Sequence, residues 1–394
     1  MNPDDKTAEI YLDNAATTRC DEAVVSAMSQ AYLSDYGNPS SMHRKGYEAE
    51  QLMRRAGQEI AGTLRVLPEE IFFTSGGTES DNLAILGCAR AGTRKGRHLV
   101  TTAVEHAAVA QTMAALAEEG FEITRLPVDE RGLVDPEEAA EAVREDTILV
   151  SVMAVNNEIG SVQDLRRIGQ AIRRKNPGVL FHTDAVQGYG KIPLSVKECG
   201  IDLLSVSGHK FHGPKGTGFL YVKKGTKIRP ILFGGGQQNG LRSGTDNVPG
   251  AVGLAAAAVQ AVSKQQEFAE RIGALREGFL TELKERIEGI RINGAQGAQA
   301  APHILSLSVP GVRAEVLLHA LEDKGIYVSA GSACSSHTAS GKQPGTATLR
   351  AIGLPPECLE STIRLSFSRD TTQAQLHTTA DALAQLVPAL RRFH

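Results

Sequence analysis

Several loop segments of this sequence carry residues suited to chemistry, and each directly follows a short apolar run. Ser75-Gly76-Gly77-Thr78-Glu79 follows residues 71–74 and opens a helical pattern. Glycines let the backbone approach a ligand closely, and a helix start offers free N–H groups, so this segment suits a phosphate group. The structural alternative is a plain helix cap formed by Thr78. The spacing is neither GxGxxG nor a P-loop, so it gives little support to a dinucleotide or nucleoside triphosphate.

A lysine in a glycine-rich loop is the second feature. Lys210 lies in Ser207-Gly208-His209-Lys210-Phe211-His212-Gly213, behind the apolar run 203–207. Desolvation and neighbouring cations lower the pKa of a lysine in such a setting, and a lysine that gives up its proton readily can form a Schiff base. A surface lysine in a glycine loop is the alternative. This alternative is less favoured because Ser207 and His209, in the same loop, could contact the same phosphate as Gly77 and Thr78.

Three further strand ends carry polar side chains. Glu105-His106 follows residues 98–103, Asn156-Asn157-Glu158 follows 147–153, and Asp184 ends the run 179–183. A histidine there can stack on a flat ring or move protons, and an asparagine can bind a carboxylate or hydroxyl. A carboxylate that ends a buried strand needs a cationic or hydrogen-bonding partner, such as a protonated ring nitrogen. The alternatives are a boundary histidine, turn-forming asparagines and a helix-capping aspartate.

The elements that must position these segments alternate between helical and extended patterns from about residue 45 to 225. Such alternation predicts a mostly parallel sheet covered on both faces, which binds ligands at the carboxyl ends of its strands. Beyond about 250 the order of strands and helices predicts a smaller α+β domain. We therefore expect a large α/β domain over residues 15–250 and a small domain over 251–394 that carries the loop 329–345. Residues 1–14 could pack on either domain.

Composition excludes several classes of protein. The 394 residues hold 42 Lys and Arg against 45 Asp and Glu, so a net charge of −3 provides no basic field for nucleic acid or an anionic membrane. The longest run of small apolar residues, 251–262, is shorter than the ~18 residues that span a bilayer. Residues 1–10 are polar and show no secretory signal. Five cysteines without a CxxC pair are too sparse for a disulfide scaffold and indicate a cytoplasmic protein.

Together the strand-end segments offer what pyridoxal 5′-phosphate (PLP) needs. That cofactor requires a phosphate cup, a residue stacked on its ring, an acid beside its ring nitrogen and an amine nucleophile. All four follow strands of one alternating pattern, so the set is more specific than any of its parts.

Over nearly its whole length the chain resembles the group I cysteine desulfurases, which belong to the class V aminotransferase family of fold-type I PLP enzymes. The motifs that carry the resemblance lie at residues 11–18, 37–41, 74–82, 105–106, 155–160, 184–187, 207–213, 242–245 and 332–336. The resemblance implies a fold-type I architecture, with a mostly parallel sheet of the seven-stranded type covered by helices and a smaller α+β domain.

The resemblance also implies roles toward the cofactor. Lys210 would hold it covalently, His106 would stack on its ring and transfer protons, and Asp184 would pair with its ring nitrogen. The remaining contacts would come from Gln187 at the ring hydroxyl, from Asn157 beside the cofactor, and from Gly77, Thr78, Ser207 and His209 at the phosphate.

Other implied roles concern the substrate and the assembly. Arg350, in Leu349-Arg350-Ala351-Ile352-Gly353, matches the clamp for the carboxylate of L-cysteine, with Asn157 nearby. Thr245 would reach the phosphate in a partner subunit, which implies a homodimer.

Cys334 is the residue on which the predicted type of reaction depends. It lies in Ala330-Gly331-Ser332-Ala333-Cys334-Ser335-Ser336, and these polar surroundings predict an exposed thiol, whose thiolate is the reactive form. The resemblance implies that Cys334 takes the sulfur of L-cysteine as a persulfide, leaves L-alanine, and passes the sulfur to an iron–sulfur scaffold or a thiolation protein. The loop 335–348 looks longer than in housekeeping members of the group and lacks their Leu-Glu-Pro-Ser. The acceptor and the placement of Arg350 therefore stay open.

Three rival readings are open to test. A selenocysteine lyase or another class V PLP enzyme would share the cofactor but not the dependence on Cys334. A metal site built from His182, Asp184, His209 and His212 matches no common closed zinc spacing, so we expect no metal. A non-enzymatic scaffold is disfavoured by the lack of repeats and heptads.

Overall fold

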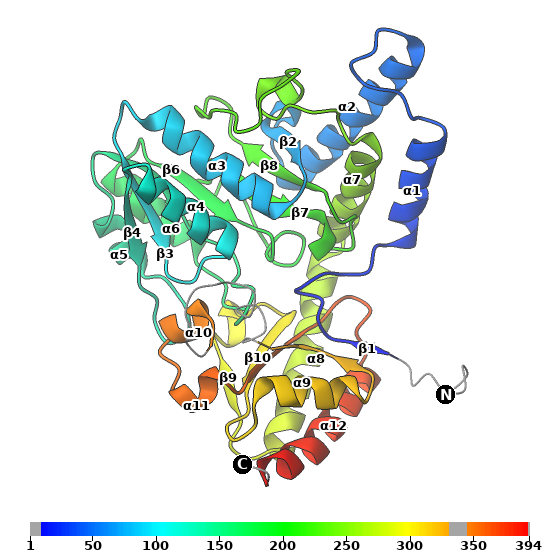
Figure 1. Cartoon of the computed structure of the whole chain (residues 1–394), viewed down its shortest axis with the longest axis vertical. Helices are drawn as coiled ribbons and strands as arrows, with labels where there is room; N and C mark the ends of the chain where they lie inside the picture. Colours follow the sequence, from blue (N-terminus) through cyan, green and yellow to red (C-terminus); the bar gives the residue numbers. More distant parts are fainter. Residues whose placement is uncertain (1–8, 331–344, 393–394) are drawn as a thin grey trace.

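A seven-stranded sheet forms the larger part of the protein (Figure 1). The computed structural model describes residues 9–330 and 345–392. The strands lie in the order β2 (Ile71–Thr74), β8 (Gly218–Val222), β7 (Leu203–Ser207), β6 (Leu180–Asp184), β5 (Thr147–Ser151), β3 (His98–Thr102) and β4 (Glu122–Leu126). Strand β8 runs antiparallel to both of its neighbours, and the other pairs are parallel. The predicted α/β class with a mostly parallel sheet is confirmed.

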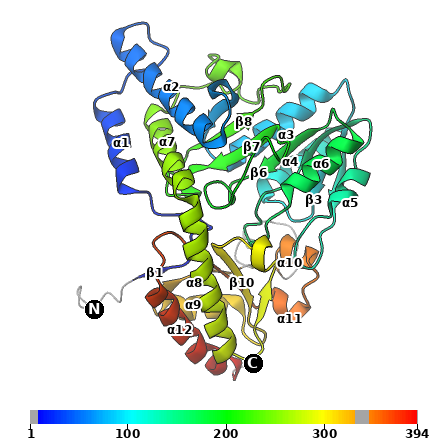
Figure 2. The same cartoon turned by 180° about the vertical axis from the view of Figure 1, so that it is seen from behind.

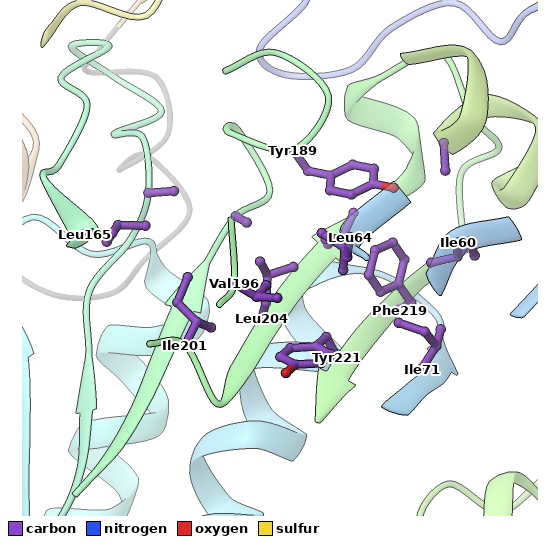
Figure 3. Close-up of a cluster of buried hydrophobic side chains, with 14 of the residues drawn as sticks. Ile60, Leu64, Ile71, Leu165, Tyr189, Val196, Ile201, Leu204, Phe219 and Tyr221 are labelled. Carbon is purple, nitrogen blue, oxygen red and sulfur yellow. The ribbon is translucent and has the colours of Figure 1, made fainter. Parts of the chain in front are cut away.

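Helices cover both faces of this sheet because successive strand residues point to opposite sides. Leu203 joins an apolar cluster beneath α3 and α4, whereas Leu204 joins the cluster that contains α2, α6 and α7. Figure 3 shows part of the second cluster, in which Ile60 and Leu64 lie beside Phe219. The helices that pack around the sheet are α1 (Glu22–Leu33), α2 (Arg44–Leu64), α3 (Gly77–Gly92), α4 (Ala107–Glu118), α5 (Pro136–Glu141), α6 (Leu165–Lys175) and α7 (Val248–Ser263).

A second, antiparallel sheet forms the lower part of the molecule in Figure 1. Its order is β12 (Ser329–Ala330), β13 (Thr362–Ser366), β10 (Ile304–Ser308) and β9 (Arg291–Asn293). A short parallel pair, β1 (Ile10–Tyr11) and β11 (Ile326–Tyr327), joins the N-terminal segment to this part. The helices here are α8 (Gln265–Arg286), α9 (Ala314–Glu322), α10 (Ala347–Ala351), α11 (Pro356–Leu359) and α12 (Gln373–Arg391).

The chain passes from one apolar core to the other near Lys264, between α7 and α8. Helix α7 packs with α1 and α2, while Ile272 and Phe279 of α8 belong to the core of the second sheet (Figure 2). Leu12 is fully buried in that second core as well. The chain thus enters the second core about one helix after residue 250, where the sequence predicts the domain boundary. The division into domains stays a prediction. Within the described ranges, no helix is both long and apolar enough to cross a bilayer.

Candidate active site

Five parallel strands place their carboxyl ends around one cavity. The loops after β2, β3, β5, β6 and β7 line it, and its volume is about 330 Å³. The sequence-predicted residues on its wall are Gly77, Thr78, His106, Asn157, Asp184, Gln187, Ser207, His209 and Lys210. Parallel register brings them together, since each motif follows its strand at the same edge of the sheet.

Gly77 begins α3 and forms the end of the cavity that suits a phosphate. A Cβ at this position would lie 2.7 Å from Val186 Cγ2 and 3.6 Å from Ser207 Cβ, so a larger residue would fill the space above the helix start. Gly76, just before it, has φ +147°, which an L side chain rarely adopts. The free N–H groups of a helix start face this space and favour an anion.

Lys210 follows β7 in a single 3₁₀ turn. Its Nζ donates hydrogen bonds to the carbonyl oxygens of Ala15 at 2.8 Å and Ala16 at 2.7 Å. The segment that carries these carbonyls is fixed to the loop by Thr18 Oγ1, which donates to His209 O at 2.8 Å. Burial and the neighbouring Lys210 lower the pKa of His209 to about 4, so this imidazole is neutral at pH 7.

Two buried carboxyl groups and one imidazole meet at the centre of the cavity. Ligand atoms of Asp81, His106 and Asp184 all lie within 4.8 Å of one another. Burial raises the pKa of Asp184, although His106 and Lys210 oppose the shift. Burial and the charge of Asp184 hold the pKa of Asp81 well above its usual range, and Asp81 Oδ1 has no hydrogen-bond partner among the described residues. A protonated ring nitrogen is therefore the kind of partner that Asp184 lacks.

His106 caps α4 and has a defined tautomer. Its Nδ1 accepts a hydrogen bond from the backbone N–H of Ala108 at 3.1 Å. In the neutral ring the proton therefore lies on Nε2. Asn156 Oδ1 accepts hydrogen bonds from the backbone N–H groups of Glu158 and Ile159, as the turn interpretation expects, and its Nδ2 donates to Val104 O. Its neighbour Asn157 lines the cavity.

Arg364 lines the cavity but is not among the residues predicted from the sequence. It lies on β13, reaches the cavity wall and donates from Nη1 to Asn157 O at 2.9 Å and from Nη2 to Asp13 Oδ1 at 2.8 Å. Its buried Nε has no hydrogen-bond partner in the described parts of the chain. A signal was present in the sequence, since Thr362, Arg364 and Ser366 alternate with apolar residues and give β13 one polar face.

Arg350, predicted to clamp the substrate, does not line this cavity. It is exposed on the short helix α10, and its Nη1 donates to Gly345 O at 2.6 Å. The neighbouring Leu349 packs into a small apolar cluster with Ile352, which turns position 350 outward. Thr245 is exposed and does not line this cavity, and Cys334 lies outside the described residues.

Comparisons with known proteins agree with this geometry. The family model described as aminotransferase class-V matches residues 10–378. A cysteine desulfurase IscS from Dictyoglomus turgidum is 43% identical over 97% of this chain and 95% of its own length. Among solved structures, a NifS-like protein matches with a TM-score of 0.90 and 39% identity, over 97% of this chain and 100% of its own. A structure titled SspA in complex with cysteine matches at 0.79 and 33% identity, over 91% and 98%.

The chain belongs to the aminotransferase class-V family. Its fold type, predicted from the motifs, is confirmed by these neighbours. Enzymes of the family depend on PLP, and the cavity fits that group. The glycine cradle at Gly77, the buried carboxyl group of Asp184 and the amine of Lys210 correspond to the phosphate, the ring nitrogen and the aldehyde of the cofactor.

The four residues of the rival metal site, His182, Asp184, His209 and His212, do not form one ligand cluster within the described parts of the chain. His182 is fully buried between two serines, with Nδ1 2.8 Å from Ser151 Oγ and Nε2 3.0 Å from Ser205 Oγ. Its Nε2 also lies 3.6 Å from Asp81 Oδ1, but burial lowers the pKa of His182 to about 3. The ring is therefore neutral, and this contact is not an ion pair.

Proposed function

We propose that this cavity is where the protein releases sulfur from L-cysteine. The protein is a PLP-dependent cysteine desulfurase that takes part in sulfur transfer, as its full-length similarity to IscS-type desulfurases shows. The observation that supports this cavity as the site is the convergence of Lys210, Asp184 and His106 above a helix start that leaves room for a phosphate. When bound, the cofactor withdraws electrons from the substrate's Cα.

Each residue of the cavity has its own role in the proposed reaction. Lys210 holds the cofactor, yields its place to the substrate amine and takes the Cα proton with the amine so released. Asp184 keeps the ring nitrogen protonated, and Gln187 meets the ring oxygen. Ser207 and His209 join Gly77 and Thr78 around the phosphate. His106 is the group that we propose for handling the thiol proton of the substrate.

Arg364 takes the role that resemblance gave to Arg350. Its guanidinium lies on the cavity wall, is fixed by Asp13 and by the carbonyl of Asn157, and keeps its Nε unused by the described residues. A carboxylate placed beside it completes the hydrogen bonds of a buried cation.

Replacing Arg364 by methionine should raise KM for L-cysteine roughly 10- to 100-fold, because a hydrogen bond to a charged group contributes about 1.5–3 kcal/mol. Initial rates of alanine formation over a range of cysteine concentrations measure this. Arg350→Met is the matched comparison and should change KM less than about twofold. The reverse result, with KM sensitive at position 350 and not at 364, would restore the sequence-based assignment. R364K and thermal unfolding curves separate lost recognition from lost folding, since Arg364 also bonds Asp13.

Cys334 is the proposed acceptor of the sulfur. Its thiolate attacks the substrate sulfur, the Cβ–S bond breaks, and its electron pair stays on carbon, which is protonated to give L-alanine. The other cysteines are poor candidates. Cys88 and Cys358 are buried, and burial raises the pKa of Cys20, Cys88 and Cys199. A raised pKa leaves less of the reactive thiolate.

A homodimer is the proposed assembly. Large apolar side chains are exposed on α1, on α2 and on nearby loops, and Phe233 is 84% exposed. They include Tyr32, Leu33, Tyr36, Met42, Tyr47 and Leu232, and helix α1 and the start of α2 lie at the edge of the molecule in Figure 1. Apolar residues gathered in this way favour a protein partner. Thr245, also exposed, would then reach the phosphate of the partner subunit.

The proposed partner downstream is an iron–sulfur scaffold or a thiolation protein of the cytoplasm. The function is tested by purifying the protein with its cofactor and incubating it with L-cysteine. A visible absorption band and equal amounts of alanine and released sulfur are expected. A colourless folded protein, or release from L-selenocysteine with none from L-cysteine, would refute the proposal.

A further inference from the structure

We propose that Lys191 is a positioning residue that fixes the side-chain amide of Gln187, so that this amide always presents an N–H donor to the active-site cavity. The inference rests on the proposed function, because the contact of Gln187 with the cofactor is part of that proposal. Lys191 does not line this cavity and touches it through Gln187.

The hydrogen bonds around Gln187 allow one orientation of its amide. Lys191 Nζ donates to Gln187 Oε1 at 3.3 Å, and Gln187 Nε2 donates to Ala15 O at 2.8 Å. An ammonium group has only donors and a carbonyl oxygen only accepts, so neither contact survives a flip of the amide. The second N–H of Nε2 is then left for the cavity. Whatever group lies against Gln187 must therefore accept a hydrogen bond, as a ring oxygen does.

The same contacts connect Lys191 to the catalytic lysine. Ala15 O accepts from Gln187 Nε2 and also from Lys210 Nζ, both at 2.8 Å. Three hydrogen bonds thus join the ammonium of Lys191 to that of Lys210 through one amide and one carbonyl. Both lysines also line a second cavity of about 410 Å³, which gives Lys191 a route for exchange of its proton.

Lys191 is a costly residue for a purely structural role. It is 6% exposed, and the charged groups that shift its pKa in the described chain, Lys210 and Arg364, are both cations. Burial, Lys210 and Arg364 together lower the pKa of Lys191 to about 7. An apolar side chain of similar size would avoid the cost of burying this charge, so its presence favours a role in the site.

Several titratable groups from different elements face Lys191 and must be considered in any titration. Lys210, Arg364, His209, His212 and His303 all interact with it electrostatically. At the second cavity, Lys264, Arg271 and Arg369 are balanced in part by Glu267 and Asp370. Burial lowers the pKa of His209, His212 and His303, so these rings stay neutral near pH 7.

The test measures the pH midpoint of the cofactor's visible absorption band in purified holoenzyme. A donor fixed on the ring oxygen favours the form that has lost its proton, so K191M should raise the midpoint by about one pH unit. K191R, which keeps a donor for Oε1, should stay close to wild type. K197M removes an exposed lysine a few residues away and serves as the matched control.

A double-mutant cycle separates positioning from a general effect of charge. If Lys191 acts through Gln187, K191M should shift the midpoint no further in a Q187M background. Equal shifts in both backgrounds, or no shift in K191M, would overturn the inference. Should K191M not fold, K191Q replaces it in the same cycle. A wild-type protein without a visible band or desulfurase turnover would instead refute the proposed function, so the two failures are distinct.

Discussion

Alanine at position 210 should abolish turnover of L-cysteine, with a loss of at least about 1,000-fold. Two contributions disappear together, namely the covalent attachment of the cofactor and the amine that takes the Cα proton. The fold should persist, because the Lys210 hydrogen bonds go to backbone carbonyls of Ala15 and Ala16 near the cavity surface, where water can replace them. Alanine formation measures the rate, and thermal unfolding measures stability.

Borohydride reduction followed by peptide mapping locates the covalent link independently of activity. In the wild-type protein the cofactor should be found on Lys210 alone. Lys215→Ala is the matched control, since Lys215 belongs to the same loop and is exposed. A reduced adduct on another lysine, or wild-type turnover in K210A, would contradict the proposed site as a whole.

Much of the site could be predicted because its residues are local to strand ends. Gly77, His106 and Lys210 each follow a strand of the large sheet within a few residues, and Asp184 is the last residue of β6. The direction of a parallel sheet then gathers these ends without any knowledge of long-range contacts. The alternation of helical and extended patterns predicts that the strands run parallel, and this prediction places their carboxyl ends at one edge of the sheet.

Arg364 could not be found in the same way because it reaches the cavity from the second sheet. Its contacts with Asp13 and Asn157 join positions more than 200 residues apart in the sequence. No local pattern in the sequence predicts which face of β13 is directed toward the large sheet. Arg350 was preferred on motif resemblance alone, and the packing of Leu349 turns it away.

The point at which the chain passes from one core to the other is hard to predict for a related reason. The helical pattern over 251–289 reads as one element in sequence, yet it forms α7 and α8 with a break at Lys264. Helix α7 buries its small residues against α1 and α2, whereas α8 packs on the second sheet. Composition changes at 250, but the partner of each helix depends on tertiary packing.

Cys334→Ala should remove sulfur release from L-cysteine by at least about 100-fold while the visible band of the cofactor stays unchanged. The reason is chemical, since in the proposed reaction the electron pair of the Cβ–S bond stays on carbon, and a nucleophile must then accept the substrate sulfur. The remaining cysteines cannot substitute, because two are buried and burial raises the pKa of Cys20 and Cys199. Alanine and sulfide measured together give the loss, and the absorption spectrum shows that the cofactor is retained.

A matched control and a mass measurement make the result specific to position 334. Cys20→Ala removes a partly exposed thiol and should leave the rate unchanged within about twofold. After incubation of the wild-type enzyme with L-cysteine, the peptide that contains residue 334 should gain the mass of one sulfur atom, and a reductant should remove it. If C334A retains full turnover, sulfur leaves the substrate without a protein persulfide. The lyase alternative, which shares the cofactor and the cavity but needs no thiol of the protein, would then be the better account of this chain.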